Sequence, residues 1–134
     1  MKRLLLAVFF LAALILPVSA SEKANTVLIH PGETIYARFE TKGKKLKLVR
    51  YSKEKDEAAQ VIFTLGPDAK KPLYNLKVEN KLPLTLLYKS EARSIKRNLK
   101  FDSPMTPVVA GKVSFEIFPK VMEELAAYGF ELEK

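Results

Sequence analysis

The stretch Thr34–Glu40, TIYARFE, sets the pattern that decides the fold of this chain. Apolar and polar side chains alternate along it at every second position, so an extended segment would bury one face and leave the other in water. The turn-forming run Thr41–Gly43 follows, and Lys44–Ser52 alternates again. The sequence therefore predicts a β-hairpin over Thr34–Ser52.

The same alternation recurs along the chain in short runs bounded by Pro, Gly, Asn and Asp. Such a pattern predicts an all-β fold, an antiparallel immunoglobulin-like β-sandwich of about 7–9 strands. The likeness to antibody domains is one of architecture, because the chain has no cysteine and no tryptophan. The further expected strands are Thr26–His30, Ala59–Leu65, Leu73–Asn80, Leu84–Glu91, Ile95–Phe101 and Lys112–Phe118, with Phe130–Glu133 as a last edge strand.

Two C-terminal segments carry specific expectations. Val121–Tyr128 also fits a short helix, since its apolar residues share one helical stripe and Gly129 stands where a helix would end. In the strand before it, alternation predicts that Val113, Phe115 and Ile117 belong to the core. Phe115→Ala is then expected to cost about 3–5 kcal/mol of stability.

The first twenty residues have the three parts of a secretory signal peptide. Met1–Arg3 is positively charged, Leu4–Leu16 is an unbroken apolar run, and Pro17–Ala20 ends it with a helix breaker and small residues. The apolar run is shorter than the roughly 20 residues that a helix needs to span a bilayer. We expect cleavage after Ala20 and a periplasmic or secreted protein that keeps no transmembrane anchor.

Residues 21–134 are then expected to form a single β-sandwich domain. Loss of Lys2 and Arg3 would lower the formal net charge from +8 to +6, so the mature protein stays basic. A charge of this size favours solubility and attraction to anions, but it does not select a fold. Without cysteine, packing and backbone pairing must hold the domain together.

The sequence argues against most catalytic chemistry. His30 is the only histidine, so a Ser-His-Asp triad would have to use it, and no Gly-x-Ser-x-Gly nucleophile motif is present. Thioether sulfur suits copper, but Met105 and Met122 show no close spacing to each other or to His30. We expect no enzymatic activity, no cofactor and no metal site. A copper carrier or an enzyme built on His30 is the alternative.

Basic residues give the one positive signal for binding. If the strands that carry them are neighbours, they form a strip that would attract anionic lipid, cell-wall polymer or nucleic acid. A solvated, aggregation-resistant surface explains the same residues. Few aromatic residues are interleaved with the charges, so no specific nucleic acid is predicted. The residues are Lys77, Lys89, Arg93, Lys96, Arg97 and Lys100.

Asp102–Pro107 is expected to be a loop stiffened by two prolines. As a contact surface it would present Met105 as an adaptable apolar tip. As a plain connection it would carry the chain from one sheet to the other.

The run Pro107–Pro119, PVVAGKVSFEIFP, resembles a group of small, uncharacterised exported bacterial proteins, and the same likeness extends to Asn80, Pro83, Leu84 and Tyr88. In that group a cysteine often precedes the proline of this run. Thr106 stands at that position here, so no thiol or disulfide role carries over. The resemblance covers roughly the C-terminal half of the chain. It implies an exported β domain and adds no catalytic residue.

The leading hypothesis is a non-enzymatic exported β-sandwich that binds or supports a cell-envelope component through a loop or a sheet edge. Its partner would be an envelope protein or an anionic polymer. The first alternative is a basic binder of anionic lipid, cell-wall polymer or nucleic acid, and the second is the metal carrier or enzyme built on His30.

Overall fold

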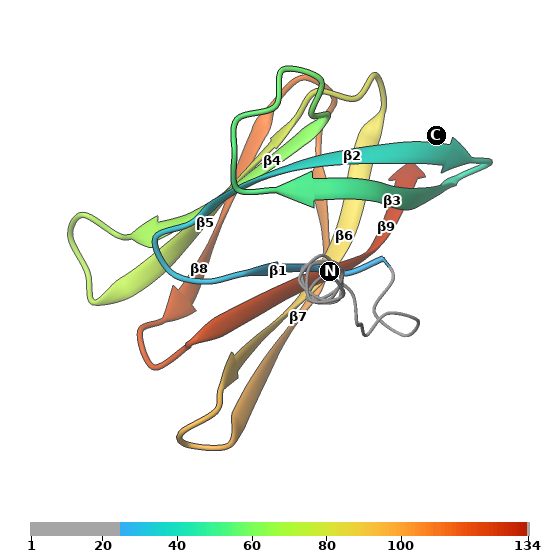
Figure 1. Cartoon of the computed structure of the whole chain (residues 1–134). Helices are drawn as coiled ribbons and strands as arrows, with labels where there is room; N and C mark the ends of the chain where they lie inside the picture. The colour runs from blue at the N-terminus through green and yellow to red at the C-terminus, as the bar shows by residue number, and fades with distance from the viewer. Residues whose placement is uncertain (1–24, 134) are drawn as a thin grey trace, which may run out of the picture.

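The computed structural model describes residues 25–133 and shows nine β-strands in this range (Figure 1). The predicted signal peptide, residues 1–20, lies outside the described residues. In the part of the chain that the structure describes, no helix is long and apolar enough to cross a membrane. The strands are β1 (Val27–Ile29), β2 (Thr34–Lys42), β3 (Lys45–Ser52), β4 (Val61–Pro67), β5 (Leu73–Asn80), β6 (Thr85–Ser94), β7 (Leu99–Val108), β8 (Val113–Pro119) and β9 (Glu124–Glu133).

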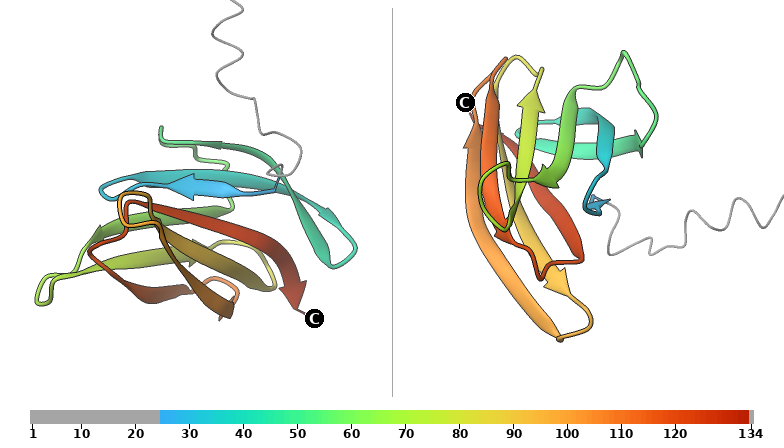
Figure 2. Two further views of the ribbon diagram at one scale, coloured as in Figure 1. Left: turned by 90° about the horizontal axis from the view of Figure 1, so that it is seen from below. Right: turned by 90° about the vertical axis from the view of Figure 1, so that its left-hand side faces the viewer.

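The strands pair antiparallel in one sheet that curls nearly into a barrel (Figures 1 and 2). Their order is β7-β6-β9-β3-β2-β4-β5-β8, and β1 pairs with β9. Side chains link the two ends of this order: Thr106 Oγ1 of β7 and Tyr88 Oη of β6 both donate to the Glu116 carboxylate of β8, at 3.3 and 2.7 Å. The all-β antiparallel class is confirmed. The expected immunoglobulin-like sandwich is not, because this strand order joins every strand into one continuous sheet.

The core fills the inside of the curl. The expected inward faces of β2 and β4 are confirmed, since every second side chain from Ile35 to Phe39 and from Val61 to Leu65 is buried. Phe63 lies at the centre, with its ring centroid 6.1 Å from that of Phe130 and 6.4 Å from that of Tyr88, both edge-on. Such aromatic contacts add to the stabilisation that burial gives.

The structure reverses the two faces of β8 that the sequence predicts. The side chains of Val113, Phe115 and Ile117 are 44–62% exposed, so the expectation that they are core is wrong. Directly opposed residues share a face of the sheet, and Phe115 pairs with Lys77, whose side chain points into solvent. The alternation was correct, but it cannot tell which of the two faces is inward. The inner face carries Ser114, Glu116 and Phe118.

The short helix expected over Val121–Tyr128 is also wrong. Residues from Glu124 onward belong to β9, which pairs along its length with β6 and at its start with β1. These ladders bury Leu125 and outweigh the weak helical pattern of the segment. Gly129, at φ 66°, is no helix stop but forms a β-bulge opposite β6, a position that needs a left-handed residue.

The expected boundaries around β7 are displaced. The strand expected at Ile95–Phe101 begins with a turn over Ile95–Asn98, and β7 runs on through the segment expected to be a loop, Asp102–Pro107. A bulge at Pro104 and Met105 absorbs one extra residue against β6. Because β7 is an edge strand, it tolerates prolines that a central strand would not.

Candidate anion-binding pocket

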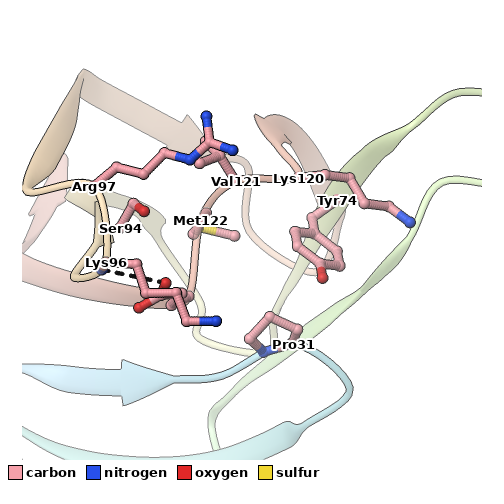
Figure 3. Close-up of a pocket in the computed structure, with 9 residues that line it drawn as sticks. Pro31, Tyr74, Ser94, Lys96, Arg97, Lys120, Val121 and Met122 are labelled. Atoms are coloured by element: carbon pink, nitrogen blue, oxygen red, sulfur yellow. Dashed lines mark hydrogen bonds between the residues drawn. The ribbon is translucent and has the colours of Figure 1, made fainter.

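A pocket of about 440 Å³ opens where three turns meet at one end of the curled sheet (Figure 3). The β6–β7 turn supplies one side of its wall, the β8–β9 turn a second and the β1–β2 turn a third. This volume is within the range of sites for small ligands. The lining residues are Pro31, Tyr74, Ser94, Lys96, Arg97, Lys120, Val121, Met122 and Glu123. We call this cavity the mouth pocket.

Three exposed cationic side chains line the mouth pocket: Lys96, Arg97 and Lys120 (Figure 3). Among the ion pairs formed by residues 25–133, none involves any of the three. The Lys120 ammonium lies 5.4 Å from the centroid of the Tyr74 ring, a cation–π contact that leaves its three N–H donors available.

Glu123 is the one carboxylate in the wall of the mouth pocket. Its two oxygens accept hydrogen bonds from the backbone N–H groups of Ile95 (3.0 Å) and Lys96 (3.4 Å). The backbone N–H of Glu123 in turn donates to the carbonyl of Arg93 at 2.8 Å. Glu123 therefore fastens the β6–β7 turn to the β8–β9 turn, and the cations outnumber the carboxylate by three to one.

Ser94 adds a buried polar group to the wall, one of four side-chain atoms of this kind without a partner among the described residues. Its side chain is buried, at 1% exposure, and its hydroxyl has no hydrogen-bond partner among the described residues. Figure 3 shows it between Lys96 and Arg97, opposite Met122. Buried hydroxyls are normally paired. An unpaired hydroxyl beside two cations is a donor suited to an oxygen of a bound anion.

The local sequence explains why these cations stand at the pocket. The β6–β7 connection is the four-residue turn Ile95–Asn98, closed by a hydrogen bond from Asn98 N to Ile95 O of 3.2 Å. Asn98 has a φ of 52°, a left-handed conformation that asparagine tolerates better than most residues. The turn therefore places Lys96 and Arg97 together at its tip.

Two other predicted binding residues, Arg93 and Lys100, are neutralised by acidic neighbours on the strands. The Arg93 guanidinium lies 2.9 Å from Glu91 and 3.1 Å from Glu124, and the Lys100 ammonium lies 3.3 Å from Glu91. Partial burial raises the pKa of Glu91, but the hydrogen bonds and charges of Arg93 and Lys100 outweigh it and hold this pKa below its usual value. These two cations therefore serve the structure of the β6–β7 hairpin.

The network of ion pairs continues through Glu124 to a second pocket, of about 430 Å³, around His30. His30 lies 3.5 Å from Glu124 through Nε2 and 3.3 Å from Glu33 through Nδ1, and Lys53 lies 2.8 Å from Glu33. The charged groups here are paired with one another. Within residues 25–133, no group of three or more His, Asp or Glu side chains is arranged to hold a metal ion.

The remaining sequence candidates lie apart from the mouth pocket. Lys89 is exposed on β6 and lies over Gly129 of β9, where an added Cβ would be 3.6 Å from its Cδ. Met105 is 37% exposed at the β7 bulge. Lys77 does not extend the basic strip, because β5 and β6 are not neighbours in the sheet.

Three residues of the pocket were missed by the sequence patterns: Tyr74, Ser94 and Lys120. The one signal for Lys120 was its position in a turn, directly after the Pro119 that ends a strand. Nothing in the local sequence shows that this turn meets the β6–β7 turn. That proximity arises only from the way β9 returns beside β6.

No family model, no curated protein and no solved structure that was compared with the chain gave a match. The resemblance of the C-terminal half to exported bacterial proteins therefore stays a prediction.

Proposed function

We propose that the protein is a non-enzymatic binding protein of the bacterial cell envelope, and that its mouth pocket holds a phosphate group of an envelope component. The observation that carries this proposal is that Lys96, Arg97 and Lys120, whose side chains form no ion pair within residues 25–133, all line one cavity. The unpartnered buried hydroxyl of Ser94 in the wall of the same cavity supports it.

Phosphate suits this set of donors. It offers several strong acceptor oxygens and a charge of about −1 to −2 near neutral pH. Arg97 presents a planar fork of N–H donors that matches phosphate geometry, while Lys96 and Lys120 act as point charges. The carboxylate of Glu123 is occupied by two backbone N–H groups and positions the turns. The pocket is accordingly a binding site and not a catalytic one.

The expected export of the protein agrees with a phosphate-bearing ligand. Residues 1–20 are proposed to be an export signal that is removed after Ala20. Export would bring a basic protein into the compartment that holds phosphate-bearing lipids and polymers. The formal charge of +6 that remains after this removal favours encounter with these anions.

The test is a titration of the ¹⁵N-labelled protein with inorganic phosphate, followed by amide NMR shifts. We expect the largest shifts at residues 94–97 and 120–123. The variant Lys96→Ala/Arg97→Ala/Lys120→Ala should weaken phosphate binding by at least about tenfold, since each charge-assisted hydrogen bond is worth roughly 1.5–3 kcal/mol.

The matched control is Lys42→Ala/Lys45→Ala/Lys47→Ala, which removes the same charge from exposed positions on the β2–β3 hairpin. It should leave phosphate binding nearly unchanged. Equal losses in both triple variants, or shifts spread evenly over the surface, would show that phosphate responds to net charge alone and would refute the pocket.

A further inference from the structure

The β6–β7 hairpin projects beyond the neighbouring strands and carries exposed apolar side chains at its tip. Figures 1 and 2 show this hairpin extending from the end of the molecule in different views. Ile95 is 70% exposed, more than any other large apolar side chain in residues 25–133, and Leu99 is 42% exposed. Among the described residues, the most exposed large apolar side chain is therefore on a protruding turn (Figure 1).

The tip is held in place by hydrogen bonds. The Ile95 carbonyl accepts from Asn98 N, and the Ile95 and Lys96 N–H groups donate to the Glu123 carboxylate. The exposure of Ile95 is thus a feature of a closed turn that is tied to the next connection. A polar residue at this position would satisfy the same backbone contacts, so the fold does not require isoleucine here.

Two cations are flanked by apolar groups on this tip. Lys96 and Arg97 lie between Ile95 and Leu99 in the sequence, and Lys120 lines the same mouth pocket from the β8–β9 turn. Apolar side chains that enter the headgroup boundary, flanked by Lys and Arg, are typical of surfaces that bind anionic bilayers. A soluble phosphate compound or a polymer would need the cations, but it would gain little from an exposed isoleucine.

We infer that the β6–β7 tip docks on an anionic lipid bilayer. Ile95 and Leu99 enter the boundary between headgroups and acyl chains, and Lys96, Arg97 and Lys120 bind lipid phosphates. This inference rests on the proposed function and names the source of the phosphate group as a lipid headgroup.

Tryptophan fluorescence tests the insertion directly, because the chain has no tryptophan of its own. In the Ile95→Trp variant, vesicles of equimolar phosphatidylglycerol and phosphatidylcholine should shift the emission to shorter wavelength. Vesicles of phosphatidylcholine alone should cause no shift. The matched control is Phe115→Trp, a 62% exposed position on the outer face of β8, whose emission should not respond to either vesicle.

Co-sedimentation measures the energetic contribution of the tip. Ile95→Ser/Leu99→Ser should lower partitioning onto the anionic vesicles by at least about tenfold, as expected for loss of apolar insertion. Phe115→Ser should partition as the unchanged protein does. An unshifted Ile95→Trp emission, full partitioning of the double serine variant, or a loss confined to Phe115→Ser would overturn the inference.

The outcomes separate this inference from the proposed function. One outcome is that inorganic phosphate shifts the amide signals of residues 94–97 and 120–123 while vesicles leave the Ile95→Trp emission unchanged. In that case the phosphate-binding pocket is supported, and a lipid headgroup is the wrong source of the phosphate group. If inorganic phosphate does not bind at the mouth pocket, the proposed function fails. The double serine variant should bind inorganic phosphate as the unchanged protein does, because it keeps all three cations.

Discussion

The β6–β7 hairpin carries two pairs of basic residues that differ in their surroundings and not in their chemistry. Arg93 and Lys100, on the paired strands, meet Glu91 within 3.3 Å. The side chains of Lys96 and Arg97, a few residues away at the turn, form no ion pair with a carboxylate among the described residues. Adjacent strands present side chains in register, so opposite charges can meet there, whereas a turn faces outward. Position in the hairpin thus separates structural charges from charges that are available to a ligand.

The largest expected effect on stability is at the neutralised pair. Arg93→Ala should lower the free energy of unfolding by about 2 kcal/mol, because it leaves two half-buried carboxylates, Glu91 and Glu124, without their shared cation. Urea unfolding measures the loss. By contrast, Lys96→Ala/Arg97→Ala should change stability by less than about 0.5 kcal/mol, as expected for exposed side chains without partners. Similar losses in the two variants would erase the distinction between them.

Acid titration sharpens the same distinction. The Asp56 carboxylate accepts two hydrogen bonds from Arg38, at 2.7 and 2.8 Å, and this pairing lowers its pKa from 3.8 to about 2. Arg93 and Lys100 likewise hold the pKa of Glu91 below its usual value against the opposing effect of burial. A folded-state pKa below the unfolded one gives stability that is complete above the unfolded pKa and is lost as the pH falls through the folded one.

We therefore expect the melting temperature to fall progressively between pH 4.5 and about pH 2. Asp56→Asn should have a lower melting temperature at neutral pH and a shallower decline towards pH 2. Lys96→Ala/Arg97→Ala should follow the unchanged protein throughout, since no carboxylate depends on these cations. An Asp56→Asn profile parallel to that of the unchanged protein would contradict the role of the Arg38–Asp56 pair.

A small effect is also expected at Phe115. Its side chain is 62% exposed on the outer face of β8, so Phe115→Ala should cost less than about 1 kcal/mol. The alternation alone had predicted a core residue and a loss of about 3–5 kcal/mol. A large loss in a denaturant melt would show that the outer face of β8 is covered in solution.

Much of the fold was accessible from the sequence because period-two alternation reports half-buried strands. The hairpin over Thr34–Ser52 and the inward faces of β2 and β4 follow directly from it. The inward face of β8 did not, because its buried side includes Ser114 and Glu116, which the pattern marks as outward. Glu116 is tolerated inside because Tyr88 and Thr106 donate hydrogen bonds to it.

Only part of the mouth pocket could be predicted from the sequence. Lys96 and Arg97 were recognised as basic residues of an expected strand, Ile95–Phe101, but the same pattern gave Arg93 and Lys100 equal weight. The acids that neutralise the latter pair come from β6 and β9, and Lys120 and Ser94 complete the pocket from separate elements. Such pairing depends on strand order, which alternation does not encode.

The most direct test of the central claim compares two double variants of the same hairpin. Arg93→Ala/Lys100→Ala and Lys96→Ala/Arg97→Ala each remove two positive charges, and the affinity of each folded protein for inorganic phosphate is measured by NMR titration. We predict that the turn variant binds at least about tenfold more weakly and that the strand variant stays within about twofold of the unchanged protein. Equal weakening in both variants, or a greater loss in the strand variant, would contradict the assignment of phosphate binding to the unpaired cations.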